Sequence, residues 1–370
     1  MDGEVVYYFL YDIGATLDLD NVKNLDSMLK EKLDMGLIEI KKSAPKYVKF
    51  PKYLCFRFED RGVLTNIGRN RIRTNIKLFP IGVISYEIRI EFSNKKMDSL
   101  FSYYNLKIIE DNEEINLEKY VERIHKEVLR AIKENIIEPY GIEVEPETHT
   151  IFCIRKISRE ELKKLNQRNI ASLLANDKEI RKLSNDIIKD RTKYSYSYYH
   201  EDLIVIDWDS AIIVEPSGKY DDILFTIELA NLQLLELRTY DKYFDTILTK
   251  AYDDVEKFFS QRNIFKSPRK IIEELSKTKI DLTRVTDYIS NISKFFGDWY
   301  LARIYRMASE RFYLSQWEER VNSKMEILNS LYLILNQENT NKKLFILELL
   351  IVIFFLIDII LIILSDYLKI

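Results

Sequence analysis

Two aspartates around a tryptophan are the residues of this sequence best placed for acid–base or metal chemistry. Asp207 and Asp209 belong to the run DWDS, which joins the apolar segments LIVIDW (203–208) and AIIVEP (211–216). Paired carboxylates can act as general acid and base or hold a hard divalent cation. Asp209 and Ser210 are also ordinary turn formers between two strands. We therefore predict a turn and keep Asp207 and Asp209 as weak candidates for a cation or enzymatic site.

The histidines add no second site to this candidate. His125, His149 and His200 are far apart, and none has another ligand at the spacing of a metal site. Neither a Gly-rich phosphate loop nor a nucleophile elbow occurs in the sequence. We accordingly expect no cofactor and no catalytic residue.

The clearest basic segment is GRNRIRTNIK (68–77). Alternate residues of a strand share a face, so Arg69, Arg71 and Arg73 would point to one side. From Arg61 to Lys77 there are five basic residues and no acid. Two alternatives follow: a solvated edge strand whose like charges prevent aggregation, or a patch, including Lys77, for anionic lipid or an RNA backbone.

The end of the sequence is strongly apolar. From Leu344 to Leu364 it reads LFILELLIVIFFLIDIILIIL, with two acids and no Gly or Pro. At about 1.5 Å per residue, a helix of this length spans about 31 Å, which matches the hydrocarbon core of a bilayer. We predict one transmembrane helix here, with membrane lipid as its surroundings.

The flanking charges predict the orientation of this helix. The start of the sequence, MDGEVVYYFL, has no basic signal-peptide region. Lys342 and Lys343 precede the apolar segment, and positive charge favours the cytoplasmic side. The prediction is a single-pass protein of the cell membrane with the bulk of the chain in the cytoplasm.

Two acids lie inside the apolar segment, Glu348 and Asp358. Ten residues apart at about 100° each, they are separated by about 80° around a helix. An ionised acid at depth costs about 2.5 kcal/mol or more. The acids are either tolerated, with Asp358 protonated or near the far interface, or form a polar stripe that faces another helix, or belong to an ion pathway. The second alternative predicts a homo-oligomer.

The remaining chain divides by its hydrophobic periodicity. Apolar or alternating runs predict strands at 4–11, 54–58, 84–92, 151–154, 203–208 and 211–216, and helical spacing occurs at 20–33, 115–137 and 158–191. These elements predict an α+β fold, with an α/β-type cytoplasmic domain at 1–216 and a further boundary near 106–115. Spacings of three and four at 223–258, 282–299 and 317–335 predict a helical hairpin or coiled-coil stalk at 217–341. The anchor and a short tail occupy 342–370.

Composition limits the class of partner. The chain has 56 Lys+Arg against 59 Asp+Glu and a formal net charge of -3, which is not the strongly basic balance of a DNA-binding protein. Its two cysteines, Cys55 and Cys153, lie in apolar runs, which favours a reducing compartment over a disulfide scaffold.

The end of the chain carries a family resemblance. LELLIVIFFLID (347–358) resembles the closing motif of the sporulation/meiotic-nuclear-division family, with Glu348 at its first acid and Asp358 where the family usually has Glu. RVNSKMEILNSLYLIL (320–335) resembles the helix before that anchor, and residues 220–245 resemble an earlier long helix. The resemblance covers roughly the last 150 residues. It implies a membrane-tethered scaffold, with a proposed link to organellar translation in eukaryotic relatives.

A soluble α/β domain, long helices and a C-terminal span also resemble the plan of the cobalt/magnesium channel family. That family needs two spans and a Gly-Met-Asn motif, and this sequence has one span and no such motif. We predict a non-enzymatic, cytoplasm-facing scaffold or tether that self-associates and docks a cytoplasmic protein or ribonucleoprotein partner. The alternatives are a membrane-bound enzyme or cation-binding protein that uses Asp207 and Asp209, or a channel-like protein without the second span.

Overall fold

The computed structural model of the chain describes residues 1–14, 16–19, 27, 29, 36–37, 53–110, 113–137, 144–158, 161–162, 165–179, 182–260, 272–273, 276 and 299–368. The chain forms two compact units, each made of two stretches of sequence. Unit 1 comprises Met1–Tyr240 and Asp287–Glu318, and unit 2 comprises Asp241–Thr286 and Glu319–Ile370.

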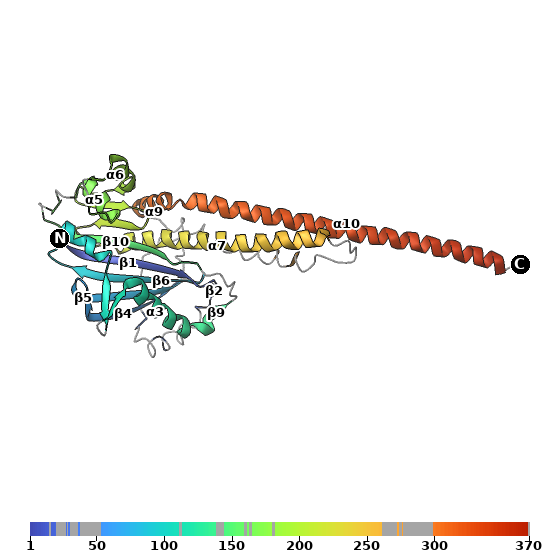
Figure 1. The fold of residues 1–370 in the computed structure, drawn as a ribbon, viewed down its shortest axis with the longest axis horizontal. Helices are drawn as coiled ribbons and strands as arrows, with labels where there is room; N and C mark the ends of the chain where they lie inside the picture. The colour runs from blue at the N-terminus through green and yellow to red at the C-terminus, as the bar shows by residue number, and fades with distance from the viewer. Residues whose placement is uncertain are drawn as a thin grey trace. The chain divides into compact units, whose positions relative to one another are not determined.

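A large sheet dominates unit 1, and Figure 1 draws its strands as arrows. The strands are β1 (Asp2–Asp12), β2 (Thr16–Leu17), β3 (Gly36–Leu37), β4 (Leu54–Thr65), β5 (Gly68–Leu78), β6 (Val83–Phe92), β7 (Lys107–Glu110), β8 (Glu113–Asn116), β9 (Ile136–Ile137), β10 (Glu147–Lys156), β11 (Ser195–Tyr196), β12 (Leu203–Ile206) and β13 (Ser210–Val214).

Within the described residues this sheet has 11 strands in the order β11-β12-β13-β10-β1-β6-β5-β4-β7-β8, with β3 paired to β4. The β10–β13 pair is parallel, whereas its neighbours β1–β10 and β12–β13 are antiparallel. β2 and β9 form a separate two-stranded ladder. The sheet is therefore mixed and mainly antiparallel.

The helices are α2 (Met97–Leu100), α3 (Leu117–Ala131), α5 (Gln167–Leu174), α6 (Asn185–Arg191), α7 (Asp221–Ser260), α9 (Trp299–Arg311) and α10 (Leu314–Leu368), with short 3-10 turns η1 (Phe101–Tyr103) and η2 (Lys133–Asn135). Local chemistry explains where α3 begins, because the Asn116 side chain accepts a hydrogen bond of 2.9 Å from the backbone N–H of Lys119.

Alternation along the strands separates an apolar face of the sheet from a polar one. On β6, Ile84, Tyr86, Ile88 and Ile90 are fully buried in the core beneath α3 and α5. The residues between them carry polar side chains and face the other way, as the period of two in a strand requires. The strand prediction at 84–92 is confirmed.

The opposite face of the sheet is covered by the first half of α7, which belongs to unit 1. Glu228 of α7 accepts a hydrogen bond of 2.7 Å from Ser85 on β6, and Arg238 forms an ion pair with Glu147 on β10. Tyr220, just before α7, donates a hydrogen bond of 2.8 Å to Glu4 on β1. Polar contacts therefore attach this helix across several strands.

Unit 2 contains the end of α7 and most of α10. Lys324 forms ion pairs with Asp241 at 2.6 Å and with Asp245 at 2.7 Å, and Arg320 pairs with Asp241 at 2.8 Å. Apolar residues of both helices, among them Phe244 and Leu335, are buried. The two segments run in the same direction, since earlier residues pair with earlier ones. This differs from a hairpin of consecutive antiparallel helices.

The predicted order of a sheet-rich N-terminal domain, then helices, then a long apolar C-terminal helix is confirmed. Most predicted strands are present. The helix predicted at 115–137 is shorter, α3 at Leu117–Ala131, because its predicted ends belong to β8 and β9. The single helix predicted at 158–191 is wrong: α5 ends at Leu174, and Asn176 turns the chain with a φ of 50° before α6. The helices predicted at 20–33 and 282–299 lie almost entirely outside the described residues.

Candidate functional site

The turn between β12 and β13 separates the two aspartates that the sequence places together. The Asp207 N–H donates a hydrogen bond of 2.8 Å to the Ser210 carbonyl, which closes the turn. The Asp207 side chain is fully buried, whereas that of Asp209 is exposed. Because one carboxylate points inward and the other outward, they do not form a paired acid–base or cation site.

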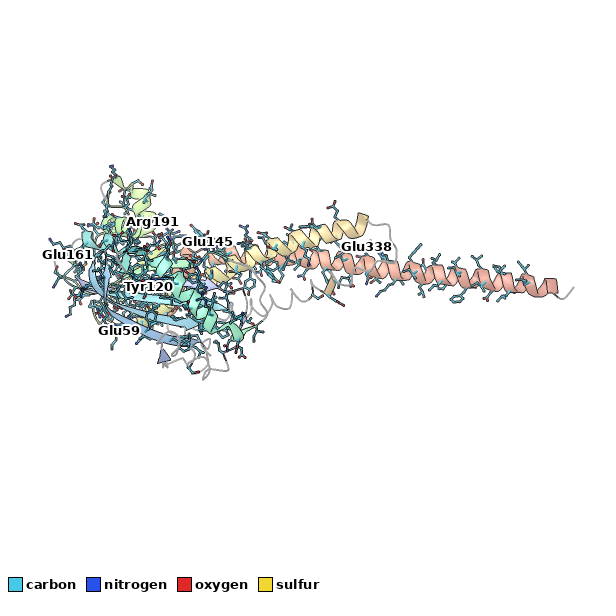
Figure 2. All side chains as sticks on the ribbon, turned by 60° about the horizontal axis from the view of Figure 1, so that its bottom comes forward. Glu59, Tyr120, Glu145, Glu161, Arg191 and Glu338 are labelled. Atoms are coloured by element: carbon cyan, nitrogen blue, oxygen red, sulfur yellow. The ribbon has the colours of Figure 1, made fainter. Side chains whose placement is uncertain are left out.

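Two arginines occupy the buried carboxylate. Arg311, the last residue of α9, donates from Nε to Asp207 Oδ1 at 2.8 Å, and Arg191, the last residue of α6 (labelled in Figure 2), donates to Asp207 Oδ2. Arg311 also pairs with Asp190 at 3.1 Å. Burial disfavours the charge of Arg311, but hydrogen bonds to Asp190 and the charge of Asp207 outweigh it and raise its pKa. With both oxygens bound by arginines, Asp207 is poorly suited to hold a cation.

Aromatic rings surround this ion pair where α9 meets α10. Phe312 is fully buried, with its ring centroid 5.6 Å from that of His149 and 6.3 Å from that of Trp208. Tyr313 has a φ of 54°, which separates α9 from α10. We call Asp190, Asp207, Trp208, Arg311 and Phe312 the junction clamp, because they fasten the start of α10 to the sheet within unit 1.

His149 lies against the junction clamp. Its side chain is 1% exposed, and burial lowers its pKa to about 3, against a smaller opposing effect of a hydrogen bond with the backbone of Trp208. The neutral imidazole of His149 can pack against the apolar ring of Phe312 without leaving a charge buried. Above acidic pH, His149 is therefore a neutral packing residue against Phe312 of the clamp.

The basic segment forms β5, which lies between β4 and β6 and is not an edge strand. Arg71 forms an ion pair with Glu59 on β4 (labelled in Figure 2), and Arg73 pairs with Glu91 on β6 at 3.4 Å. Arg69 is exposed. Acids on the neighbouring strands thus offset much of the positive charge, a cross-strand arrangement that sequence spacing could not reveal.

Lys77 lies apart from this surface. Its side chain is 5% exposed and forms ion pairs with Glu87 at 2.8 Å and with Glu228 of α7. The two carboxylates outweigh the effect of burial and raise the pKa of Lys77, while Lys77 and Arg89 outweigh burial and lower that of Glu87. An anionic partner at the surface cannot reach this ammonium, so Lys77 attaches α7 to the sheet instead of extending an exposed patch.

A pocket of about 300 Å³ opens on the apolar face of the sheet. Tyr7 and Phe9 of β1 form its floor, Tyr103 and Tyr104 line its wall, and Thr150 comes from β10. The Tyr7 hydroxyl donates a hydrogen bond of 2.7 Å to the Tyr103 carbonyl, which joins floor and wall. Polar side chains, among them Asn105, Lys107 and Glu118, complete the lining, so the pocket is mixed in character and does not indicate one class of ligand.

The acids of the apolar segment, Glu348 and Asp358, lie on the exposed end of α10. Among the described residues, α10 is the one helix long and apolar enough to cross a membrane, with none of its most apolar stretch buried.

Metal ligation was the other possibility for the acids and histidines. No group of three or more potential metal ligands occurs in the described part of the chain. The sequence does not reveal the role of Arg311 in the junction clamp, because Arg311 is 104 positions from Asp207 and no local motif marks it.

Comparison with known proteins identifies the N-terminal part of the chain. A family model described as "Uncharacterized protein MJ0711, N-terminal domain" matches residues 2–221, more than half of the 370 residues, so the chain belongs to this family. A curated relative, "Uncharacterized protein MJ0711" of Methanocaldococcus jannaschii, is 28% identical over 276 residues, which cover 69% of this chain and 83% of the relative. No solved structure matches the chain.

The match corrects the resemblance drawn from the last 150 residues. The chain's family is defined by its N-terminal domain, and the assignment to the sporulation/meiotic-nuclear-division family is wrong. The motif that suggested it is a run of Leu, Ile and Phe around two acids. Any helix that must be apolar over its whole length draws on the same few residues, so such a run carries little family information.

Proposed function

We propose that this member of the MJ0711 N-terminal domain family is a single-pass scaffold of the cell membrane that self-associates and docks a cytoplasmic partner. The apolar end of α10 carries the proposal. Its large apolar side chains from Leu344 to Leu364, apart from the half-buried Ile346, are exposed, from 42% at Ile353 to 65% at Phe355. A continuous apolar surface of this length is unfavourable in water and favourable in a bilayer.

Charge at the start of this segment supports a cytoplasmic orientation. Lys342 and Lys343 directly precede Leu344 on α10. Lysines at the membrane edge are retained on the cytoplasmic side, so unit 1 would face the cytoplasm. Glu348 and Asp358 then lie within the bilayer, where hydrogen bonds to a second copy of the helix would favour a homo-oligomer.

The junction clamp and the helices of unit 2 support a role as a scaffold rather than as a bare membrane anchor. α10 is continuous from Leu314 to Leu368, and the end of α9 just before it is fastened to the β12–β13 turn by the Asp207–Arg311 ion pair. The parallel helices of unit 2 would act as a coiled-coil stalk, held by Lys324 between Asp241 and Asp245.

Removing residues from Lys342 onward tests the anchor. The full chain should sediment with membranes and resist an alkaline carbonate wash, whereas the shortened chain should be soluble. A matched variant, in which Lys342 and Lys343 are replaced by Gln in the full chain, should remain in the membrane with a weaker orientation preference, measured by protease accessibility. A shortened chain that still resists the carbonate wash would contradict the proposal.

A further inference from the structure

A cluster of aromatic rings, three of them exposed (Tyr198, Tyr199 and Trp299) and two half-buried, lies where β11 meets the start of α9. We call it the tyrosine platform; it consists of Tyr196, Tyr198, Tyr199, Trp299 and Tyr300. All five residues belong to unit 1. Tyr199 is 70% and Trp299 is 62% exposed, more than any other large apolar side chain described as exposed outside α10. So much exposed aromatic area in one place marks an interaction surface.

The rings of the platform support one another. The ring centroid of Tyr198 lies 4.5 Å from that of Tyr199, 5.7 Å from that of Trp299 and 5.5 Å from that of Tyr300. Most of these pairs are steeply inclined, with an interplanar angle of 83° between Tyr198 and Tyr300. Rings that meet edge to face leave faces and edges open to a ligand instead of closing into a stack.

The backbone beneath the rings is also fixed before any partner binds. The carboxylate of Asp202, which is 7% exposed, accepts hydrogen bonds from the backbone N–H groups of Tyr198 at 2.7 Å and Tyr199 at 3.0 Å. These bonds hold the two exposed tyrosines of the platform, Tyr198 and Tyr199, at one turn. A preorganised surface loses little conformational entropy on binding, which favours affinity.

Charge distinguishes between the ligands that bind aromatic surfaces. Arg303 lies over the Tyr196 ring, with its guanidinium carbon 5.9 Å from the ring centroid, and Lys193 lies 5.0 Å from the centroid of Tyr194. The exposed acid Glu201 follows Tyr199 by two residues. Charges of both signs leave no basic track for a phosphate backbone, as binding of single-stranded RNA requires. The surface favours an uncharged partner.

Hydrogen-bonding chemistry narrows the choice further. Trp299 presents an indole N–H and the exposed tyrosines present hydroxyl groups, so the platform is rich in donors. A proline-rich segment in the polyproline II conformation has free carbonyl acceptors, few N–H groups and rings that pack on aromatic side chains. We propose that the tyrosine platform binds an extended, proline-rich segment of a cytoplasmic partner protein. This inference rests on the proposed function for the existence of a docked partner.

Fluorescence anisotropy with the full-length protein in mild detergent tests the assignment. The probes are fluorescein-labelled decaproline, a Gly–Ser peptide of the same length and a decauridylate RNA. Decaproline should bind with little dependence on salt, because no ion pairs are needed, and the other two should not bind. Decaproline affinity equal to that of the Gly–Ser peptide, or salt-dependent binding of the RNA alone, would overturn the proposal.

Single substitutions locate the surface. Trp299→Ala and Tyr199→Ala should each weaken decaproline binding at least about tenfold, as expected for central aromatic anchors. Tyr252→Ala is the matched control, since Tyr252 is 51% exposed on α7 but lies in unit 2, and it should change nothing. Trp299→Phe keeps a ring without the N–H and should retain part of the affinity, even if Trp299→Ala folds poorly.

The outcomes are separable from the test of the anchor. If Trp299→Ala or Tyr199→Ala loses decaproline binding but still sediments with membranes, the partner site lies at the platform. Equal weakening by Tyr252→Ala, or unchanged binding in both Trp299 variants, would place the binding elsewhere and overturn the inference. A shortened chain that is soluble and still binds decaproline would uphold both the anchor and the platform.

Discussion

Asp207 and Asp358 are both acids in apolar surroundings, yet the chain treats them differently. Asp207 is fully buried in unit 1, where Arg191 and Arg311 neutralise its charge. Asp358 lies on an exposed helix among Ile and Leu side chains, and no ion pair to it is described. A buried acid must find its partner within the fold, whereas an acid on an exposed apolar helix must find it in another molecule or remain uncharged.

This difference distinguishes charged groups that hold the fold together from groups that could contact another molecule. Near the sheet, acids that sequence reasoning could assign to catalysis are occupied by arginines and lysines: Asp207 by Arg311, and Glu87 and Glu228 by Lys77. Surfaces that these ion pairs leave exposed include the aromatic rings of Tyr198, Tyr199 and Trp299 and the acids of α10. Function is therefore to be sought at these surfaces before the buried ion pairs.

The largest expected effect is a loss of stability when the ion pair of buried Asp207 is broken. Arg311→Ala should lower the free energy of unfolding by about 3 kcal/mol, the lower end of the range for breaking a buried ion pair, because Arg191 still contacts Asp207. Thermal unfolding in detergent would measure it. Arg306→Ala is the matched control, since Arg306 is exposed on the same helix.

A second substitution sharpens this result. In the Arg311→Ala background, Asp207→Asn removes the charge left without one of its partners, so it should cost less there than in the native chain. Equal costs in both backgrounds would mean that Asp207 and Arg311 do not interact, and the junction clamp would need another explanation.

The sequence anticipates elements whose side chains repeat regularly, but not pairings between distant residues. The alternation at 84–92 predicts β6, and the long run of Leu, Ile and Phe predicts the apolar end of α10. That β5 lies inside the sheet is decided by the register of β4, where Glu59 meets Arg73 across the ladder and Arg71 in an ion pair. The partner of Lys77 on α7 is 151 positions away, and no local pattern encodes it.

The pH dependence of stability tests the packing of His149 against the junction clamp. The lowered pKa of His149 in the folded protein means that the unfolded chain binds the proton first, below its ordinary pKa of about 6.5. Its contribution to stability is present above that pH and is lost toward pH 3, at up to about 1.4 kcal/mol per pH unit. Between pH 6.5 and 5 the free energy of unfolding should fall by about 1.6 kcal/mol from this residue.

Comparison of variants isolates this histidine from other titrating groups. His149→Leu should flatten the fall in stability between pH 6.5 and 5, measured by thermal unfolding at several pH values. His200→Gln should leave it unchanged, because His200 is exposed. His125, whose pKa burial lowers to about 4, would account for the slope that remains. An unchanged slope in His149→Leu would show that the ring is not held neutral against Phe312.

The smallest expected effect concerns the acid of the apolar helix. If Asp358 hydrogen-bonds to a second copy of α10, Asp358→Leu should weaken association by about 0.6–2 kcal/mol, while insertion becomes easier because the polar group is gone. A peptide of residues 336–370 in bilayers should therefore show fewer cross-linked dimers with Leu at 358, at unchanged membrane content. The peptide is needed because contacts of the stalk could hold the full-length protein together without the acid. Ile359→Leu is the matched control, since it changes a neighbouring side chain without adding or removing a polar group. Equal cross-linking of the native and Asp358→Leu peptides would mean that the acid has no partner across an interface, and the contrast with Asp207 would then rest on protonation alone.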